Sequence, residues 1–273
     1  MTRRRGLSLG LRIIGLASGL TMLFPFIWML STSFKSASEG LTVPPTLLPQ
    51  HATLANYRNA VELVPLWRMF GNSLAVSAVA TTAQILTSAM AAYGFSRICF
   101  RGRDGLFMLY LATMMIPFQV TVVPLFMEMQ HFGLVDSYPA LVLPMVASAF
   151  GVFLLRQGML KLPRELEEAA IVDGAGHIRI FARIVLPLVA PALATFGILS
   201  FMATWNSFLW PLVVISTNEK MTLPLGLANL HGQYTTDWGL VMAGTSFAVV
   251  PIVLVYIVAQ RRITEGFLMS GLK

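Results

Sequence analysis

The segment KLPRELEEAAIVDGAGHIRIFARIVLPLVAP, residues 161–191, carries the most information about the fold of this chain. It is unusually charged for the chain. Its first half predicts a short helix, because Pro163 suits the first helical position and the acidic residues that follow favour the positive N-terminal end of a helix. Gly174 and Gly176 then interrupt that helix.

The second half of the segment predicts another short helix. Ile178, Phe181 and Val185 are spaced three and four residues apart as an apolar stripe, with Arg179 and Arg183 on the polar side. We therefore expect two short helices joined at a glycine turn on the cytoplasmic surface. Two interpretations stay open: an amphipathic element lying on the membrane, or a helix pair that docks into a groove of a soluble partner.

The rest of the chain is strongly apolar. Of its 273 residues, 56% are hydrophobic and 11% are charged, and the mean hydropathy is +0.73. A soluble domain carries about 25% charged residues, so the composition indicates a membrane protein. The net charge of +7 lies in short segments between apolar stretches. That pattern is typical of membrane topology and does not predict a nucleic-acid partner.

Charge-free intervals define the predicted membrane spans. Roughly 20 apolar residues cross the hydrocarbon core as a helix. The predicted spans of this all-α membrane protein are about 13–34, 70–96, 105–127, 137–156, 191–214 and 238–260. The fifth begins at Pro191, because the charge-free interval 184–218 is too long for one span and prolines punctuate it. We interpret residues 1–273 as one transmembrane domain.

The distribution of basic residues predicts the orientation. Of the 19 Lys and Arg residues, fifteen lie on the side of both termini and four on the other side. The positive-inside rule then places the N and C termini and the 161–190 loop in the cytoplasm, and segment 35–69 outside. The first span is less well explained as a cleaved signal peptide, because it exceeds the apolar core of about 7–15 residues that such peptides have.

Several function classes lack support in the sequence. No carboxylate lies mid-span, which disfavours an ion-coupled transporter. No G-x-x-x-x-G-K-[ST] motif is present, so any ATP is bound by another chain. The single cysteine, Cys99, and four scattered histidines predict neither a disulfide nor a metal site. No set of convergent side chains predicts catalytic residues, which disfavours a membrane-embedded enzyme.

The residue identities within the 161–191 segment favour one class of membrane protein. Glu168-Ala169-Ala170, three residues, Gly174, nine residues, Ile184, one residue and Leu186-Pro187 resemble the EAA motif of permease subunits of binding-protein-dependent ABC importers. The resemblance extends along nearly the whole chain, through TSFK at 32–35, AAYGFSR at 91–97 and MAG at 242–244. It is greatest to permeases of maltose-like and glycerol-3-phosphate-like carbohydrate uptake systems.

The resemblance implies a type I ABC importer permease fold with six helices in a bacterial inner membrane. It also implies a second homologous permease subunit, an extracytoplasmic solute-binding protein, and a cytoplasmic ATPase dimer that binds ATP and Mg, with no cofactor in this chain. The residues that the resemblance assigns to ATPase coupling are Glu168, Ala169, Ala170, Asp173, Gly174, Ala175, Ile184, Leu186 and Pro187. Glu168 would meet a basic or hydrogen-bonding group of the ATPase, and Gly174 would make the turn.

The sequence indicates the transported solute less clearly than it indicates the family. Asn72, Gln119, Trp205 and Asn206 are candidates for a translocation pathway, although such residues commonly hold helices together. Many relatives carry an acidic residue after Trp-Asn, where this chain has Ser207. The resemblance implies a carbohydrate or a related polyol, amino sugar or sugar phosphate. The absence of Lys and Arg from the predicted spans favours a neutral sugar.

An ion or solute channel is the alternative from another class. Its loop would merely lie on lipid headgroups, and the purified chain alone would conduct without ATP.

Overall fold

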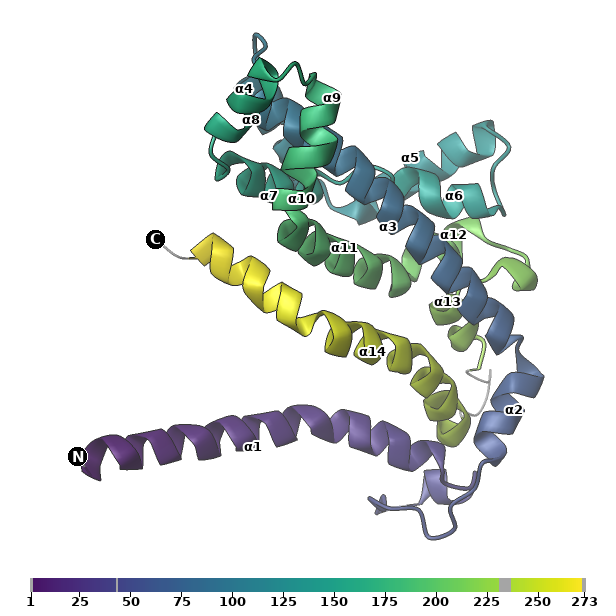
Figure 1. The fold of residues 1–273 in the computed structure, drawn as a ribbon. Coiled ribbons are helices and arrows are strands. Elements are labelled where there is room, and N and C mark those ends of the chain that lie inside the picture. Colours follow the sequence, from purple (N-terminus) through teal and green to yellow (C-terminus); the bar gives the residue numbers. More distant parts are fainter. Residues whose placement is uncertain (1, 43, 231–236, 272–273) are drawn as a thin grey trace. The chain divides into compact units, whose positions relative to one another are not determined.

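The computed structural model describes residues 2–42, 44–230 and 237–271, and every regular element in those ranges is a helix (Figure 1). This confirms the predicted all-α class. The helices before the glycine turn are α1 (Thr2–Ser33), η1 (Glu39–Leu41), α2 (Ala55–Leu63), α3 (Leu66–Arg97), α4 (Arg103–Ala112), η2 (Thr113–Met115), α5 (Phe118–His131), α6 (Tyr138–Val142), η3 (Leu143–Met145), α7 (Ala149–Leu160) and α8 (Glu165–Val172). Those after it are α9 (His177–Ile180), the π-helix η4 (Phe181–Val185), α10 (Leu186–Leu188), α11 (Ala190–Trp205), α12 (Leu209–Val214), η5 (Asn218–Lys220), α13 (Leu223–Ala228) and α14 (Trp238–Gly271).

The chain forms two compact units. The first comprises Met1–Trp67 with Gly226–Val250, and the second comprises Arg68–Leu225 with Pro251–Lys273. The 161–191 segment lies wholly within the second unit.

In the first unit, α2 is tied to the end of α1. Asn56 is buried, and its Nδ2 donates to the carbonyls of Ser33 (2.9 Å) and Lys35 (2.7 Å). Phe247 of α14 packs against the rings of Tyr57 and Trp67, with centroid distances of 6.2 and 5.5 Å. Aromatic packing and buried hydrogen bonds thus hold this unit together.

Some of the helices are long and apolar enough to cross a membrane. Among the described residues these are Gly15–Ser33 and Leu66–Arg97, and the number rises from two to five if each of three bent pairs is one span. The bent pairs are Arg103–Met115 with Phe118–His131 (98°), Tyr138–Met145 with Ala149–Leu160 (46°) and His177–Leu188 with Ala190–Trp205 (78°). Trp238–Leu254 is a shorter apolar helix. The six spans and the side of the termini stay predictions.

Local chemistry accounts for the first two of these bends. Ile116 is extended, as the residue before a proline favours, and α5 begins after Pro117. Ser148 caps α7 by accepting a hydrogen bond from the Gly151 N–H. The helix expected over 191–214 is interrupted, because α11 ends at Trp205 and α12 begins at Leu209.

An apolar core in the second unit underlies the 161–191 segment. Its largest buried members come from α3, α4, α7, the α9–η4 stretch and α11, and include Tyr93, Phe107, Leu155, Met159, Ile180, Val185 and Phe196. The segment is therefore supported from within the unit, and many of its other residues are exposed in the described part of the chain.

Candidate functional site

Helix α8 begins with three carboxylates in its first turn, at Glu165, Glu167 and Glu168. They lie near the positive end of the helix dipole, as expected. Pro163 does not occupy the first helical position. It precedes the N-cap residue, Arg164, so the helix starts slightly later than the sequence predicts.

The end of α8 is a Schellman turn at Gly174. The N–H of Gly174 donates to the carbonyl of Ile171 (2.9 Å), and the N–H of Ala175 donates to that of Ala170 (2.9 Å). Gly174 has a φ of +80°, a left-handed conformation that L side chains disfavour. Ala170 and Ala175 both pack against the apolar core. The expected glycine turn is thus present, and its backbone conformation requires glycine.

The start of α8 is anchored by a buried ion pair. Oε1 of Glu167 lies 2.6 Å from Nε of Arg97, and the two side chains are 13% and 5% exposed. Arg97 is the last residue of α3, and its Nη2 also donates to the carbonyls of Met159 (2.7 Å) and Leu162 (3.0 Å). One guanidinium therefore joins the ends of α3 and α7 to the start of α8.

The face of α8 away from the core is acidic and apolar, whereas α9 exposes an isoleucine beside the basic residue Arg179. Glu168 is exposed, and so are Val172 (88%) and Ile178 (85%). Among the other residues of the motif, Ala169, Asp173, Gly174 and Pro187 are exposed, and Ala170, Ala175, Ile184 and Leu186 are half-buried. Exposed aliphatic side chains beside a carboxylate suit contact with a partner protein.

The apolar stripe of the second helix differs from the prediction. Ile178 is exposed, whereas Ile180 and Val185 are buried and Phe181 is half-buried. The stretch Phe181–Val185 is a π-helix and not the regular α-helix that the spacing predicts. Phe181 and Val185 pack into this unit, and an exposed Ile178 is compatible with both interpretations of the stripe.

Aromatic contacts seat α9 on α3. The hydroxyl of Tyr93 lies 3.3 Å from Nδ1 of His177, and the rings of Tyr93 and Phe181 are 5.2 Å apart. These contacts add to the ion pair at Arg97. Both ends of the helix pair are thus fixed to the same long helix.

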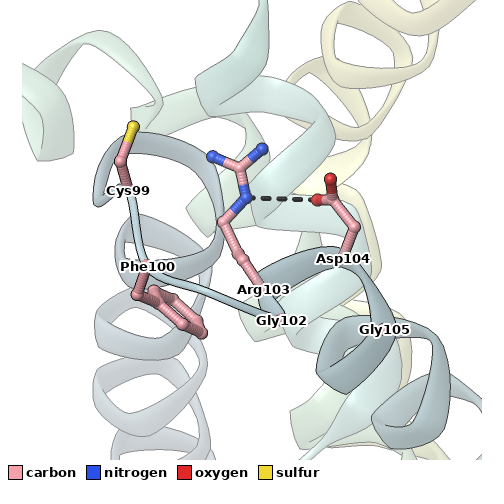
Figure 2. A pocket seen from close by; sticks show the side chains of 6 residues that line it. All are labelled: Cys99, Phe100, Gly102, Arg103, Asp104 and Gly105. Atoms are coloured by element: carbon pink, nitrogen blue, oxygen red, sulfur yellow. Dashed lines mark hydrogen bonds and ion pairs between the residues drawn. The ribbon is translucent and has the colours of Figure 1, made fainter.

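The loop between α3 and α4 lines a small pocket (Figure 2). Gly102 has a φ of +82° and precedes α4. Figure 2 shows the guanidinium of Arg103 beside the carboxylate of Asp104, with Nε 3.1 Å from Oδ1. Arg156 of α7 reaches the same carboxylate (3.5 Å) and stacks over the ring of Phe107 (4.1 Å). The pocket's charged groups are therefore engaged with one another.

A second polar cluster joins loop 132–137 to residues 216–220. Oδ1 of Asp136 accepts hydrogen bonds from the backbone N–H groups of Ser216 and Thr217 (both 3.0 Å), and Oδ2 accepts from the Thr217 hydroxyl and from Nζ of Lys220 (3.1 Å). These hydrogen bonds, with those from Thr217 foremost, hold the pKa of Asp136 well below its usual range. We call these four residues the Asp136 cluster.

The candidate pathway residues have varied surroundings. Nδ2 of Asn72 donates to the carbonyls of Glu219 (2.8 Å) and Met221 (2.9 Å), and its Oδ1 accepts from the Tyr138 hydroxyl (2.9 Å). Asn72 thus holds segments of the protein together.

The other three candidates differ in exposure. Gln119 is exposed on α5, and Asn206 is exposed and donates to the carbonyl of Met202. Trp205 is buried, with its ring 5.5 Å from that of Phe70. Their predicted contact with a transported solute stays a prediction.

Sequence reasoning missed Arg97, Glu167 and the Asp136 cluster. Their partners lie about 70 or 80 positions away in the chain, and no spacing rule links such residues. Within the described ranges, no group of three His, Cys, Asp or Glu side chains is arranged to hold a metal ion.

Comparison with known proteins identifies the family. Residues 84–266 match the family described as binding-protein-dependent transport system inner membrane component. The arabinooligosaccharides transport system permease protein AraQ of Halalkalibacterium halodurans is 38% identical, over 92% of this chain and 91% of that protein. The lactose transport system permease protein LacG of Rhizobium radiobacter is 36% identical, over 94% and 93%.

A solved structure has the same fold. The crystal structure of a bacterial ABC transporter involved in the import of the acidic polysaccharide alginate contains a chain that matches with a TM-score of 0.84 and 23% identity, over 94% of this chain and 96% of that chain. The type I ABC importer permease fold is thereby confirmed. The family match covers well over half of the residues, and this chain therefore belongs to the inner-membrane components of binding-protein-dependent transport systems, the permease subunits of ABC importers.

Proposed function

We propose that this chain is one of two permease subunits of an ATP-driven importer that carries a carbohydrate or a related solute into the cytoplasm. In this proposal the chain performs no catalysis. A separate cytoplasmic ATPase dimer binds ATP and Mg, and an extracytoplasmic solute-binding protein delivers the solute. The family description names binding-protein dependence directly.

We call the exposed face of α8 and α9, with Glu168, Val172 and Ile178, the α8–α9 surface. This surface is the proposed contact with the ATPase. The observation that carries this assignment is its outer face, exposed among the described residues, on which Glu168 lies one helical turn from exposed Val172 and to which α9 adds exposed Ile178. The inner face is fixed by the Glu167–Arg97 pair and the turn at Gly174. A rigid helix pair with an exposed acidic and aliphatic face suits insertion into a groove of a partner.

The proposed membrane arrangement is multi-pass, with both termini in the cytoplasm. The basic residues support it through their 15 to 4 distribution. Segment 35–69 and the Asp136 cluster then lie outside, on the side that receives the solute-binding protein.

The proposed solute is a neutral sugar or oligosaccharide. Two relatives with high coverage are named for arabinooligosaccharide and lactose transport. The predicted spans contain no Lys or Arg except Arg156, which is the last residue of span 137–156 at its cytoplasmic end, so they offer no cation in mid-membrane for a phosphate or a carboxylate. A charge supplied by the second permease would change this expectation.

Affinity purification of the tagged chain from its native membrane tests the proposal. We expect mass spectrometry to find a second permease and a P-loop ATPase in the eluate, with ATP hydrolysis stimulated by a solute-binding protein. Recovery of the chain alone, under conditions that preserve a known importer complex, would contradict the proposal. ATP-independent conductance of the purified chain would favour the channel alternative.

A further inference from the structure

Two adjacent carboxylates of α8 have opposite surroundings. Glu167 faces inward to Arg97, with its side chain 13% exposed. Glu168 is exposed, and the part of the chain that the structure describes gives its side chain no partner. Successive residues of a helix point about 100° apart, so one carboxylate can serve as an internal anchor while the next is free for an external contact.

Arg97 is suited to its position by the geometry of its guanidinium. It contacts Glu167 through Nε and the carbonyls of Met159 and Leu162 through Nη2. The Nε contact is an ion pair without hydrogen-bond geometry, and Nη2 makes the two hydrogen bonds. A planar guanidinium can hold a carboxylate at one edge and two carbonyls at another, which the ammonium of lysine does not reproduce. The contact is also nearly dry, since the Arg97 side chain is 5% exposed.

Helix α3 connects this contact to the opposite end of the second unit. It runs from Leu66 to Arg97 and contains no proline. Near its start, Asn72 donates to the carbonyls of Glu219 and Met221, and the hydroxyl of Ser73 accepts from the N–H of Leu223 (2.7 Å). From Ser73 to Arg97 the helix is roughly 36 Å long at about 1.5 Å per residue. An unbroken helix of that length can move as one body.

We propose that Arg97 is a positioning residue that locks the α8–α9 surface to α3, so that displacement of this surface is carried through α3 to segment 219–223. The inference rests on the proposed function, in which an ATPase binds and moves the surface. Glu168 makes the external contact, and Glu167 passes the movement to Arg97. Without the ion pair, the Tyr93 contacts still hold α9 and η4 to α3, but the start of α8 moves without displacing the end of α3.

The test follows movement at the far end of α3 in the complex purified with its ATPase and reconstituted in lipid nanodiscs. A Cys99→Ser, Asn218→Cys background provides one thiol in η5, next to segment 219–223, because Cys99 and Asn218 are both exposed. The rate of reaction with a membrane-impermeant maleimide is measured with and without vanadate-trapped ATP. The variants are Arg97→Gln, Glu167→Gln and the double change, and Glu165→Gln is the matched control on an exposed position of the same helix.

We expect nucleotide trapping to change the labelling rate in the parent and in Glu165→Gln. Arg97→Gln and Glu167→Gln should keep the ATPase but lose the change. Removing one partner leaves a buried unpaired charge, so the single variants are expected to be less stable. The double variant has no such charge, and it should regain thermal stability without regaining the nucleotide response.

Three results would overturn the proposal: a response that persists in Glu167→Gln, a response restored in the double variant, or no response in the parent complex that contains the ATPase. Failure of the proposed function gives a different result, namely a parent preparation that contains no ATPase. Failure of the Arg97 proposal alone leaves the ATPase in the preparation and changes only the labelling response.

Discussion

The ring of Phe196 on α11 fills the space that a side chain at Gly151 of α7 would need. A Cβ at this position would also come within 2.6 Å of Oγ of Ser88 on α3. Three helices of the second unit therefore meet at one glycine. Small residues at such crossings allow close approach of membrane helices.

We expect Gly151→Ala to destabilise the protein by about 1–3 kcal/mol, because the added methyl group overpacks the crossing. Thermal unfolding in detergent measures this. Gly158→Ala on the same helix is the control, since its Cβ would lie 3.5 Å from that of Ala192, an ordinary contact. Equal midpoints for the two variants would show that the crossing tolerates a side chain.

Gly174→Ala should weaken the turn after α8 by about 1–2 kcal/mol, the cost of a left-handed conformation for an L residue. The consequence is lower recovery of the ATPase with the purified chain. Gly176→Ala should have a smaller effect, because Gly176 has a φ of −78°, which any residue adopts. The account would fail here if the Gly176 variant lost more ATPase than the Gly174 variant.

The Asp136 cluster predicts a specific pH dependence. The pKa of Asp136 is lowered in the folded protein from its ordinary value of 3.8. The stabilisation is therefore present above that ordinary value and is lost as the pH falls through the lower folded-state value. Between about pH 5 and 8 the carboxylate stays ionised, and we expect constant protection of the Ser216 and Thr217 amides.

Hydrogen exchange, corrected for intrinsic rates, measures that protection. Asp136→Asn should lower it at every pH in this range, because Lys220 loses its ionic partner and the amide cannot accept the same hydrogen bonds at both positions. Glu128→Gln, an exposed change in α5, serves as the control. Loss of protection in the parent protein between pH 7 and 5 would disagree with the low pKa of Asp136.

Asn72 is expected to contribute to stability. Asn72→Ala removes two hydrogen bonds that the side chain donates and one that it accepts. We expect this change to lower the free energy of unfolding by about 1–3 kcal/mol, measured by thermal unfolding. Asn206 follows α11, and Asn206→Ala removes one exposed hydrogen bond to the last turn of that helix. This change should alter stability by less than about 0.5 kcal/mol. Indistinguishable unfolding of the two variants would refute a structural role for Asn72.

The sequence predicted the class of fold and the glycine turn well, because both depend on local composition and spacing. It could not predict the bend near Pro117 within the expected span 105–127, or the interruption between Trp205 and Leu209 within the expected span 191–214. The π-helix at Phe181–Val185 also escapes the sequence, because α-helical periodicity carries no signal for it. The Arg97–Glu167 pair required the tertiary structure, since the two residues are far apart in the chain.

The central claim is that the α8–α9 surface couples this permease to its ATPase. The most direct measurement is ATPase recovery and sugar uptake for Glu168→Lys beside Glu165→Lys, both in the first turn of α8 and both exposed. We predict that Glu168→Lys loses both activities while the chain stays in the membrane, and that Glu165→Lys keeps them. Normal uptake and normal ATPase recovery for Glu168→Lys would contradict the account.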